Sequence, residues 1–128
     1  MKRNVLIIFV IVVMLVLVLA ACGGSTTPAD AGKELFAQST IGDQPGCITC
    51  HSLEPGVIII GPSVAGIASR AGLMVSGLSA EEYLHQSIVD PNAYLVPGFP
   101  TDTMPPVWGQ RLSEKQVDEL VAYMQTLK

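Results

Sequence analysis

Cys47-Ile48-Thr49-Cys50-His51 is the stretch from which the rest of the chain can be interpreted. In a Cys-x-x-Cys-His pattern the two thiols attach to a porphyrin through thioether bonds, and the adjacent imidazole is placed to bind the iron. The motif therefore predicts a covalently attached c-type haem held by Cys47 and Cys50, with His51 as one axial ligand of the iron.

Two other chemistries use the same pair of cysteines. A redox-active Cys-x-x-Cys does not need the histidine that follows it, and the sequence contains no second Cys-x-x-Cys to complete a zinc ribbon. The haem is therefore preferred over a redox pair and over half of a zinc site.

The composition favours the same interpretation. Of the 128 residues 49% are hydrophobic, but much of this lies in the first 21 residues, and only 5% of the chain is aromatic. The remainder is about one small domain, and a domain of about 100 residues has only a modest apolar core. A buried haem would supply the missing apolar mass.

The charge balance excludes one class of partner. Removing Lys2 and Arg3 from the seven basic residues leaves five against eleven acidic residues, a net charge of −6 for residues 22–128. We do not expect a nucleic-acid partner, because phosphate binding needs a basic face. A positively charged docking patch on a protein partner would fit, although such a charge more often serves solubility.

The N-terminus has the layout of an export signal. Lys2 and Arg3 precede an apolar run from Val5 to Ala21, and Leu19-Ala20-Ala21-Cys22 resembles a bacterial lipobox, in which the signal is cut before a cysteine that carries lipid. The alternative is an uncleaved anchor helix, since about 17 residues span about 25 Å of a hydrocarbon core of about 30 Å. We favour lipidation of Cys22, which leaves no cysteine for a disulfide. Either version predicts a membrane-anchored domain facing the periplasm or the cell exterior.

We expect a signal peptide or membrane segment over residues 1–21, a flexible linker over 22–29 and one domain over 30–128. Asp30 is a suitable N-cap for a first helix, with Leu35 and Phe36 on its apolar side. Residues 41–46, rich in Gly and Pro, end this helix before the haem motif.

The later elements are mostly helical. Ser79 with Glu82, and Ser113 with Gln116, form capping boxes that open two helices, the first reaching Val89. A short helix over 63–70, closed by Gly72, precedes them. The apolar stripe of the last helix comprises Val117, Leu120, Val121, Met124 and Leu127.

Two segments are expected to be irregular. Residues 57–60 are β-branched but have no partner strand, so we interpret them as an extended segment beside the haem. Residues 91–111 form a long loop with four prolines after its first residue, too many for helix or sheet. A loop of this length in a small domain usually has a function. The sequence thus predicts an all-α domain of three main helices and several short ones.

The second axial ligand of the iron has few candidates. His85 lies inside a predicted helix, Met74 in a Gly-rich connection and Met124 on the last helix. Met104 is the only methionine on the proline-stiffened loop, where the backbone could hold a thioether at low entropic cost. We therefore favour Met104, while a methionine in general more often fills gaps in a core.

With these residues in view, residues 30–128 resemble a class I bacterial mono-haem cytochrome c. Cys47, Cys50 and His51 match the haem-binding motif, and Met104-Pro105 matches the sixth-ligand motif. The resemblance implies that the carbonyl of Pro62 accepts a hydrogen bond from the ligand imidazole and that Arg70 approaches a haem propionate. It also implies that Gly32 and Phe36 of the first helix cross closely over Leu120 and Tyr123 of the last.

A finer resemblance involves residues 87–94 and Pro97-Gly98-Phe99. These look like the cytochrome c domains of haem-copper oxidase subunit II, and the chain is also similar to the lipid-anchored mono-haem subunit of alternative complex III. These 128 residues contain no copper-binding domain, so we do not expect the chain to be subunit II itself.

The resemblance implies one-electron transfer in a respiratory or photosynthetic chain, by a carrier or by a subunit of a larger redox complex rather than by an enzyme. A terminal oxidase or a quinol-oxidising complex would be a suitable partner. A ligand-binding or peroxidatic haem is the alternative, which needs an open sixth site. Trp108 and Tyr94 could line the haem or carry electrons, although packing is the preferred role for both.

Overall fold

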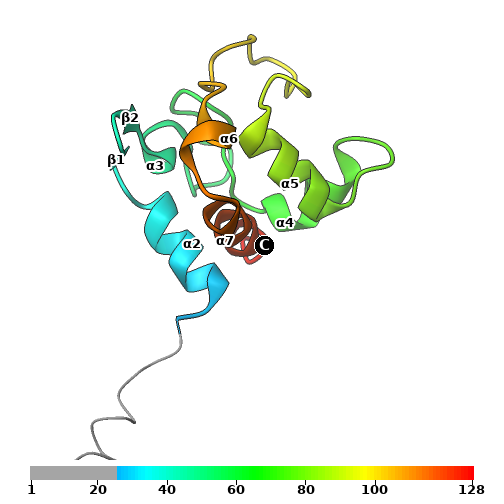
Figure 1. The fold of residues 1–128 in the computed structure, drawn as a ribbon. Coiled ribbons are helices and arrows are strands. Elements are labelled where there is room, and N and C mark those ends of the chain that lie inside the picture. The colour runs from blue at the N-terminus through cyan, green and yellow to red at the C-terminus, as the bar shows by residue number, and fades with distance from the viewer. Residues whose placement is uncertain (1–25) are drawn as a thin grey trace, which may run out of the picture.

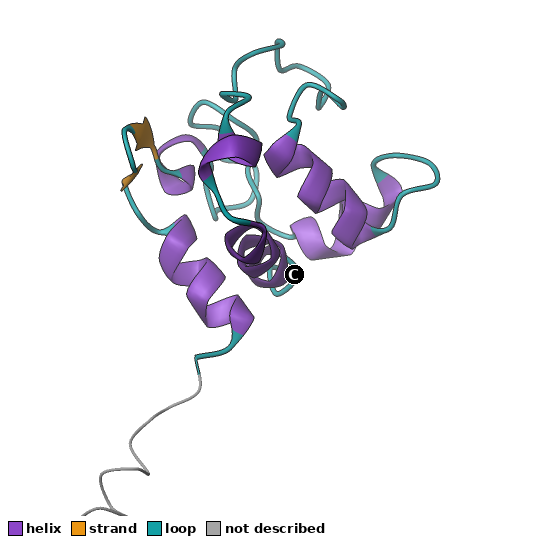
Figure 2. Ribbon diagram, viewed as in Figure 1, coloured by secondary structure: helices purple, strands orange, loops and turns teal. Residues whose placement is uncertain are grey.

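The computed structural model describes residues 26–128, so the predicted export signal and Cys22 lie outside the described residues. The domain is mainly helical, as predicted, with one very short antiparallel strand pair (Figures 1 and 2). Its elements in order are α2 (Pro28–Phe36), β1 (Thr40–Ile41), β2 (Gln44–Pro45), α3 (Cys47–Cys50), α4 (Ile67–Arg70), the 3-10 helix η1 (Ala71–Leu73), α5 (Ala80–Val89), α6 (Trp108–Arg111) and α7 (Glu114–Met124). Within this part of the chain, no helix is long and apolar enough to cross a membrane.

The three longer helices, α2, α5 and α7, each begin with a capping box. In α5 the Ser79 side chain accepts from the Glu82 N–H, and in α7 Ser113 and Gln116 make the same pair, as predicted. The prediction for α2 was wrong: Thr27 is its N-cap and Asp30 occupies the third helical position, with its carboxylate accepting from the Thr27 N–H at 3.2 Å. The helix therefore starts at Pro28, a residue well suited to a first helical position because its missing N–H would be unpaired there anyway.

The crossing of α2 over α7 organises the core. A Cβ placed on Gly32 would lie 1.8 Å from the carbonyl oxygen of Glu119, so only glycine permits this approach. Beside it the rings of Phe36 and Tyr123 pack with centroids 5.5 Å apart and an interplanar angle of 58°. The predicted close contact of the first and last helices is confirmed, with the backbone at Glu119 and Leu120 as the nearest partner of Gly32.

Other boundaries differ from the sequence-based predictions. The helix expected over residues 63–70 is shorter, Ile67–Arg70, and the prediction that Gly72 closes it was wrong, because η1 continues past Gly72 to Leu73. The last helix ends at Met124, where the N–H groups of Thr126 and Leu127 bond only three residues back, to the carbonyls of Tyr123 and Met124, so Leu127 lies outside it. Residues 107–111, expected as loop, include the helical turn α6, which is anchored by the buried Trp108.

Candidate functional site

The short helix α3 presents both cysteines of the motif to one cavity. Cys47 and Cys50 are three residues apart and so lie on the same side of a helical turn. Both are free thiols, and both line the cavity together with His51, which follows directly at the end of the helix. The hydroxyl of Thr49 donates to the carbonyl of Gly46 at 2.6 Å and so fastens the turn on which the cysteines stand.

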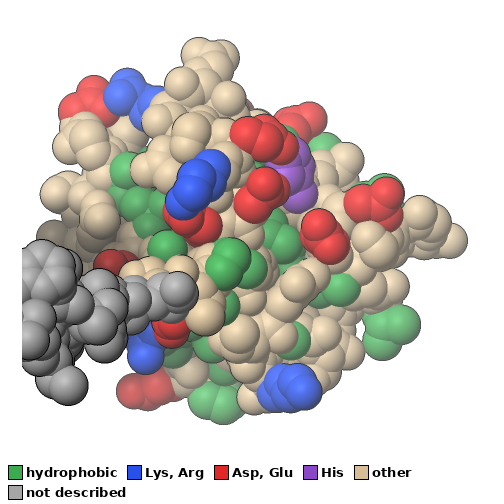
Figure 3. Space-filling model, turned by 60° about the horizontal axis from the view of Figure 1, so that its bottom comes forward, with side chains coloured by type: hydrophobic (Ala, Val, Ile, Leu, Met, Phe, Trp, Pro, Cys, Tyr) green, Lys and Arg blue, Asp and Glu red, His purple; other side chains and the backbone are tan. Residues whose placement is uncertain are grey.

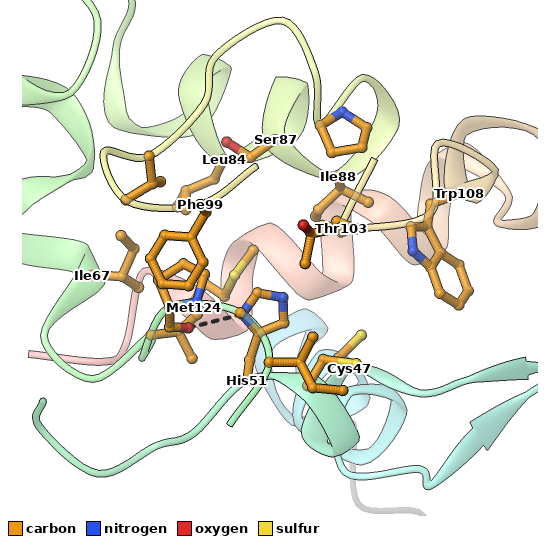
Figure 4. Close-up of a pocket in the computed structure, with 18 of the residues that line it drawn as sticks. Cys47, His51, Ile67, Leu84, Ser87, Ile88, Phe99, Thr103, Trp108 and Met124 are labelled. Carbon is orange, nitrogen blue, oxygen red and sulfur yellow. Dashed lines mark hydrogen bonds between the residues drawn. The ribbon is translucent and has the colours of Figure 1, made fainter. Parts of the chain in front are cut away.

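His51 is held in one orientation. Its Nδ1 lies 2.9 Å from the carbonyl oxygen of Pro62, the contact drawn as a dashed line in Figure 4. Because a carbonyl only accepts, Nδ1 carries the proton in this contact, and the lone pair of the neutral ring is on Nε2. Burial lowers the pKa of His51, the carbonyl of Pro62 partly opposing it, so the imidazole is mainly neutral at pH 7. The predicted contact between His51 and Pro62 is therefore present.

Gly61 makes room for this imidazole. A Cβ at position 61 would lie 2.6 Å from Cε1 of His51 and 3.0 Å from its Nδ1, closer than real side chains approach. The N–H groups of Ile60 and Gly61 both donate to the carbonyl of Cys50, at 3.2 and 2.9 Å. The Gly61-Pro62 turn is thus fastened directly to the cysteine motif.

These backbone bonds also determine where the apolar run before Gly61 lies. Ile60 lines the cavity, but the run from Val57 to Ile60 is exposed, with Ile58 at 64%. The run has neither helix nor strand, as predicted, yet only its last residue is beside the cavity. The hydrogen bonds to the Cys50 carbonyl fix the end of the segment at Ile60, and the side chains before it remain exposed.

The cavity is apolar and is enclosed by elements from the whole domain. Figure 4 shows Ile67, Leu84 and Ile88 at its edge, with Phe99 and Thr103 contributed by the long loop between α5 and α6. Gly98 has a φ of +92°, which a glycine adopts without steric cost, and the Phe99 N–H closes this turn on the carbonyl of Val96 at 3.1 Å. A flat hydrophobic cofactor would meet aliphatic and aromatic side chains here.

The methionine candidates converge on this cavity. Met74, Met104 and Met124 all line it, whereas His85 does not. Met124 belongs to the buried core of α7, while Met104 and Met74 are partly buried. Met104 alone of the three lies on the long loop, so its backbone can be positioned without altering a helix.

His85 lies on the outer surface between α5 and α7. Its Nε2 is 3.0 Å from Oε1 of Glu114, and Asp118 is close to both. The face shown in Figure 3 carries more acidic than basic side chains, in keeping with the negative charge of this part of the chain. The interpretation of His85 as a polar residue on a helix agrees with this position.

Arg70 lines the cavity, but its guanidinium also braces the adjacent turn. Its Nη2 donates to the carbonyl of Ser63 at 2.7 Å, and its Nη1 donates to the carbonyl of Ala65. The side chain is therefore partly committed to the backbone between Pro62 and α4. Its predicted approach to a propionate stays a prediction.

Two aromatic residues singled out in the sequence, Trp108 and Tyr94, both line the cavity and also pack against other side chains. Trp108 is buried and lines the cavity from α6, and Tyr94 packs edge-on against Tyr83 of α5 with ring centroids 5.9 Å apart. The Tyr83–Tyr94 contact ties the start of the long loop to α5. Sequence reasoning missed Tyr83, Phe99 and Thr103 as lining residues, because no spacing rule connects a loop to a distant cavity.

The chemistry of the donor set decides between the three interpretations of the motif. Burial raises the pKa of the Cys47 thiol to about 11, which is the opposite of the lowered pKa that activates a redox-active cysteine. A zinc site needs four nitrogen, sulfur or oxygen ligands, and the group of possible ion ligands among residues 26–128 is His85, Glu114 and Asp118, away from the cysteines. Two thiols, an oriented imidazole and an apolar cavity fit a covalently bound haem.

An all-α domain with this thiol, imidazole and thioether set around an apolar cavity defines a c-type haem protein. Residues 29–128 match the protein-family model described as cytochrome c. The chain therefore belongs to the cytochrome c family, whose members bind haem covalently and carry electrons.

Proposed function

We propose that this cytochrome is a membrane-tethered one-electron carrier, or the electron-carrying subunit of a larger redox complex, in a bacterial respiratory or photosynthetic chain. It carries a single haem, with His51 and Met104 as the axial ligands. The single observation that supports this ligand pair best is that His51 and Met104 line one cavity with both motif cysteines, while His85 lies outside it.

When bound, the haem supplies an iron that changes between ferrous and ferric without a bond being made or broken. The protein's own residues set the conditions for that change. The Pro62 carbonyl, 2.9 Å from Nδ1 of His51, increases the basicity of the imidazole. A Met104 thioether favours the ferrous state and raises the potential.

The apolar lining keeps water from the site. Leu84, Ile88 and Trp108 are all at most 7% exposed, and each contributes to the wall of the cavity. Fixed, dry surroundings leave little solvent to reorganise when the charge on the iron changes, which suits rapid electron exchange.

The alternative is a ligand-binding or peroxidatic haem, and the position of Met104 at the cavity argues against it. Either protein needs an open sixth position, and a peroxidatic one also needs a residue placed as an acid or base. Among the described residues the second histidine, His85, bonds Glu114 on the surface and cannot serve the cavity.

Redox titration of the holo-protein, followed optically, tests the choice between these functions. We expect a single one-electron transition, low-spin spectra in both oxidation states and no spectral change when carbon monoxide is added to the ferrous form. A high-spin ferrous form that binds carbon monoxide would support the alternative.

We propose that the partner is a redox protein such as a terminal oxidase or a quinol-oxidising complex, since an electron carrier must exchange electrons with another redox protein. The apolar run 57–60 supports a protein contact, because residues 55–69 contain no charged side chain and Ile60 adjoins the cavity. Purification from detergent-solubilised membranes tests it. Co-purification with oxidase or quinol-oxidising subunits would indicate that the cytochrome is a subunit of that complex. Purification of the cytochrome without other proteins would indicate a carrier.

A further inference from the structure

One side chain, Asn92, closes the loop that carries Met104. Its Nδ2 donates to Oδ1 of Asp102 at 2.8 Å. Its Oδ1 accepts from the Asp102 N–H at 3.0 Å and from the Thr101 hydroxyl at 3.1 Å. The nitrogen and the oxygen of the side-chain amide thus both bond to the turn at Thr101 and Asp102, just before Met104.

The turn that Asn92 holds is an unfavourable one. Asp102 has a φ of +59°, and within the described residues it is the non-glycine residue with a positive φ. Aspartate tolerates this region better than most residues, but the conformation persists only when its surroundings stabilise it. Asn92 holds both the backbone N–H and the carboxylate of Asp102, so it stabilises the conformation from two directions.

The chain next to Met104 has further constraints on both sides. Pro105 and Pro106 fix φ at about −65°, and the Thr103 hydroxyl closes the preceding turn by donating to the Pro100 carbonyl at 2.9 Å. Asn92 adds the constraint that reaches across the loop, since its partners are nine and ten residues further along the chain. It therefore couples Met104 to the end of α5.

We propose that Asn92 is a positioning residue that keeps the Met104 thioether presented to the haem iron. This inference rests on the proposed function, in which Met104 is a ligand. Exposed loops open with small free energies, and an open loop leaves the sixth position to any competing ligand. The hydrogen bonds of Asn92 disfavour that open state, so losing them should strengthen the binding of external ligands.

Three variants test the proposal, with imidazole as the external ligand of the ferric holo-protein. In Asn92→Ala we expect imidazole to bind about tenfold more tightly, equivalent to about 1.4 kcal/mol. Amide hydrogen exchange at Phe99, whose N–H keeps its bond to the Val96 carbonyl in the variant, should also accelerate, which reports on the loop independently of the iron. His85→Ala, which removes another exposed hydrogen bond of 3.0 Å, should change neither quantity.

A reciprocal exchange provides the rescue. Asn92→Asp alone places a second carboxylate beside Asp102 and should loosen the loop at pH 7. Combined with Asp102→Asn, it reverses donor and acceptor while restoring the pair, and imidazole affinity should return toward that of the wild type.

Wild-type imidazole affinity in Asn92→Ala would overturn the proposal, as would a lower Tm with unchanged affinity, because the residue would then be structural only. Met104→Ala separates this failure from failure of the proposed ligand. Retention of the thioether-to-iron charge-transfer band in Met104→Ala would exclude Met104 itself. If Met104→Ala loses that band while Asn92→Ala keeps the imidazole affinity of the wild type, only the proposed role of Asn92 is rejected.

Discussion

Gly32 of α2 lies directly against the carbonyl of Glu119 on α7, with no space for a methyl group between them. Gly32→Ala should therefore force the two helices apart and lower the free energy of unfolding of the holo-protein by about 1–3 kcal/mol, the usual cost of overpacking. Denaturant or thermal unfolding of the two proteins measures this difference in the free energy of unfolding.

Gly72→Ala is the matched control for this prediction. A Cβ at Gly72 would meet its nearest atom, the backbone nitrogen of Ala80, at an ordinary 3.4 Å. Equal stability of the two variants would show that the crossing of α2 and α7 can relax at no cost.

Gly61→Ala should disturb the imidazole of His51 and leave the covalent attachment intact. The added Cβ would lie 2.6 Å from the ring, so the ring must move and lose its good contact with the Pro62 carbonyl. Electron paramagnetic resonance of the ferric protein should show altered g values. An unchanged spectrum would mean that the Gly61-Pro62 turn does not orient His51.

The capping box of α5 predicts an acid-dependent loss of stability. The Ser79 N–H donates to Oε2 of Glu82 at 2.8 Å and holds the pKa of Glu82 below its ordinary value of 4.5. A lowered folded-state pKa stabilises the fold above the unfolded pKa, and this contribution disappears as the pH falls through the folded-state value.

Glu82→Gln should therefore lower the Tm slightly at about pH 7 and not at about pH 2, where the carboxylate of the wild type is also uncharged. Glu81→Gln, in the same helical turn but outside the capping box, should have a smaller effect at neutral pH. The effect is small because Glu82 is exposed. A loss of equal size at both pH values would contradict the charge argument.

Cys22 is expected to be the lipid-modified N-terminus of the mature protein, because Leu19-Ala20-Ala21 precedes it. Mass spectrometry of the protein isolated from membranes should find no peptide from residues 1–21 and a lipid-sized mass addition on Cys22. Detection of Met1 with the apolar run intact would replace the lipid by an anchor helix.

The features that the sequence predicted well depend on residues that are close together in the chain. The Ser79 and Ser113 capping boxes involve residues three positions apart, so the starts of α5 and α7 follow from the sequence. The start of α2 follows the same rule at Thr27 and Asp30, but the Gly, Ser and Thr residues before it suggested a linker instead. The haem motif also places the two sulfurs that attach the haem and the nitrogen that binds its iron within five residues.

What could not be predicted depends on contacts between distant residues. Trp108 begins a helical turn after a pair of prolines because its ring is buried against the core, which no local pattern reveals. In the sequence Asn92 is one residue of the segment 87–94, and no local pattern assigns it a role in the loop. Its role in the loop appears once Asp102, ten residues later, is brought beside it.

The central claim is that Met104 is the second ligand of the iron, and the reduction potential of Met104→Ala tests it most directly. Met124→Ala and Met74→Ala are the matched controls, because both methionines line the same cavity. We expect Met104→Ala to retain covalent haem, lose the thioether-to-iron charge-transfer band and have a clearly lower potential, while both controls keep the band. A Met104→Ala protein with the band and potential of the wild type would contradict the account.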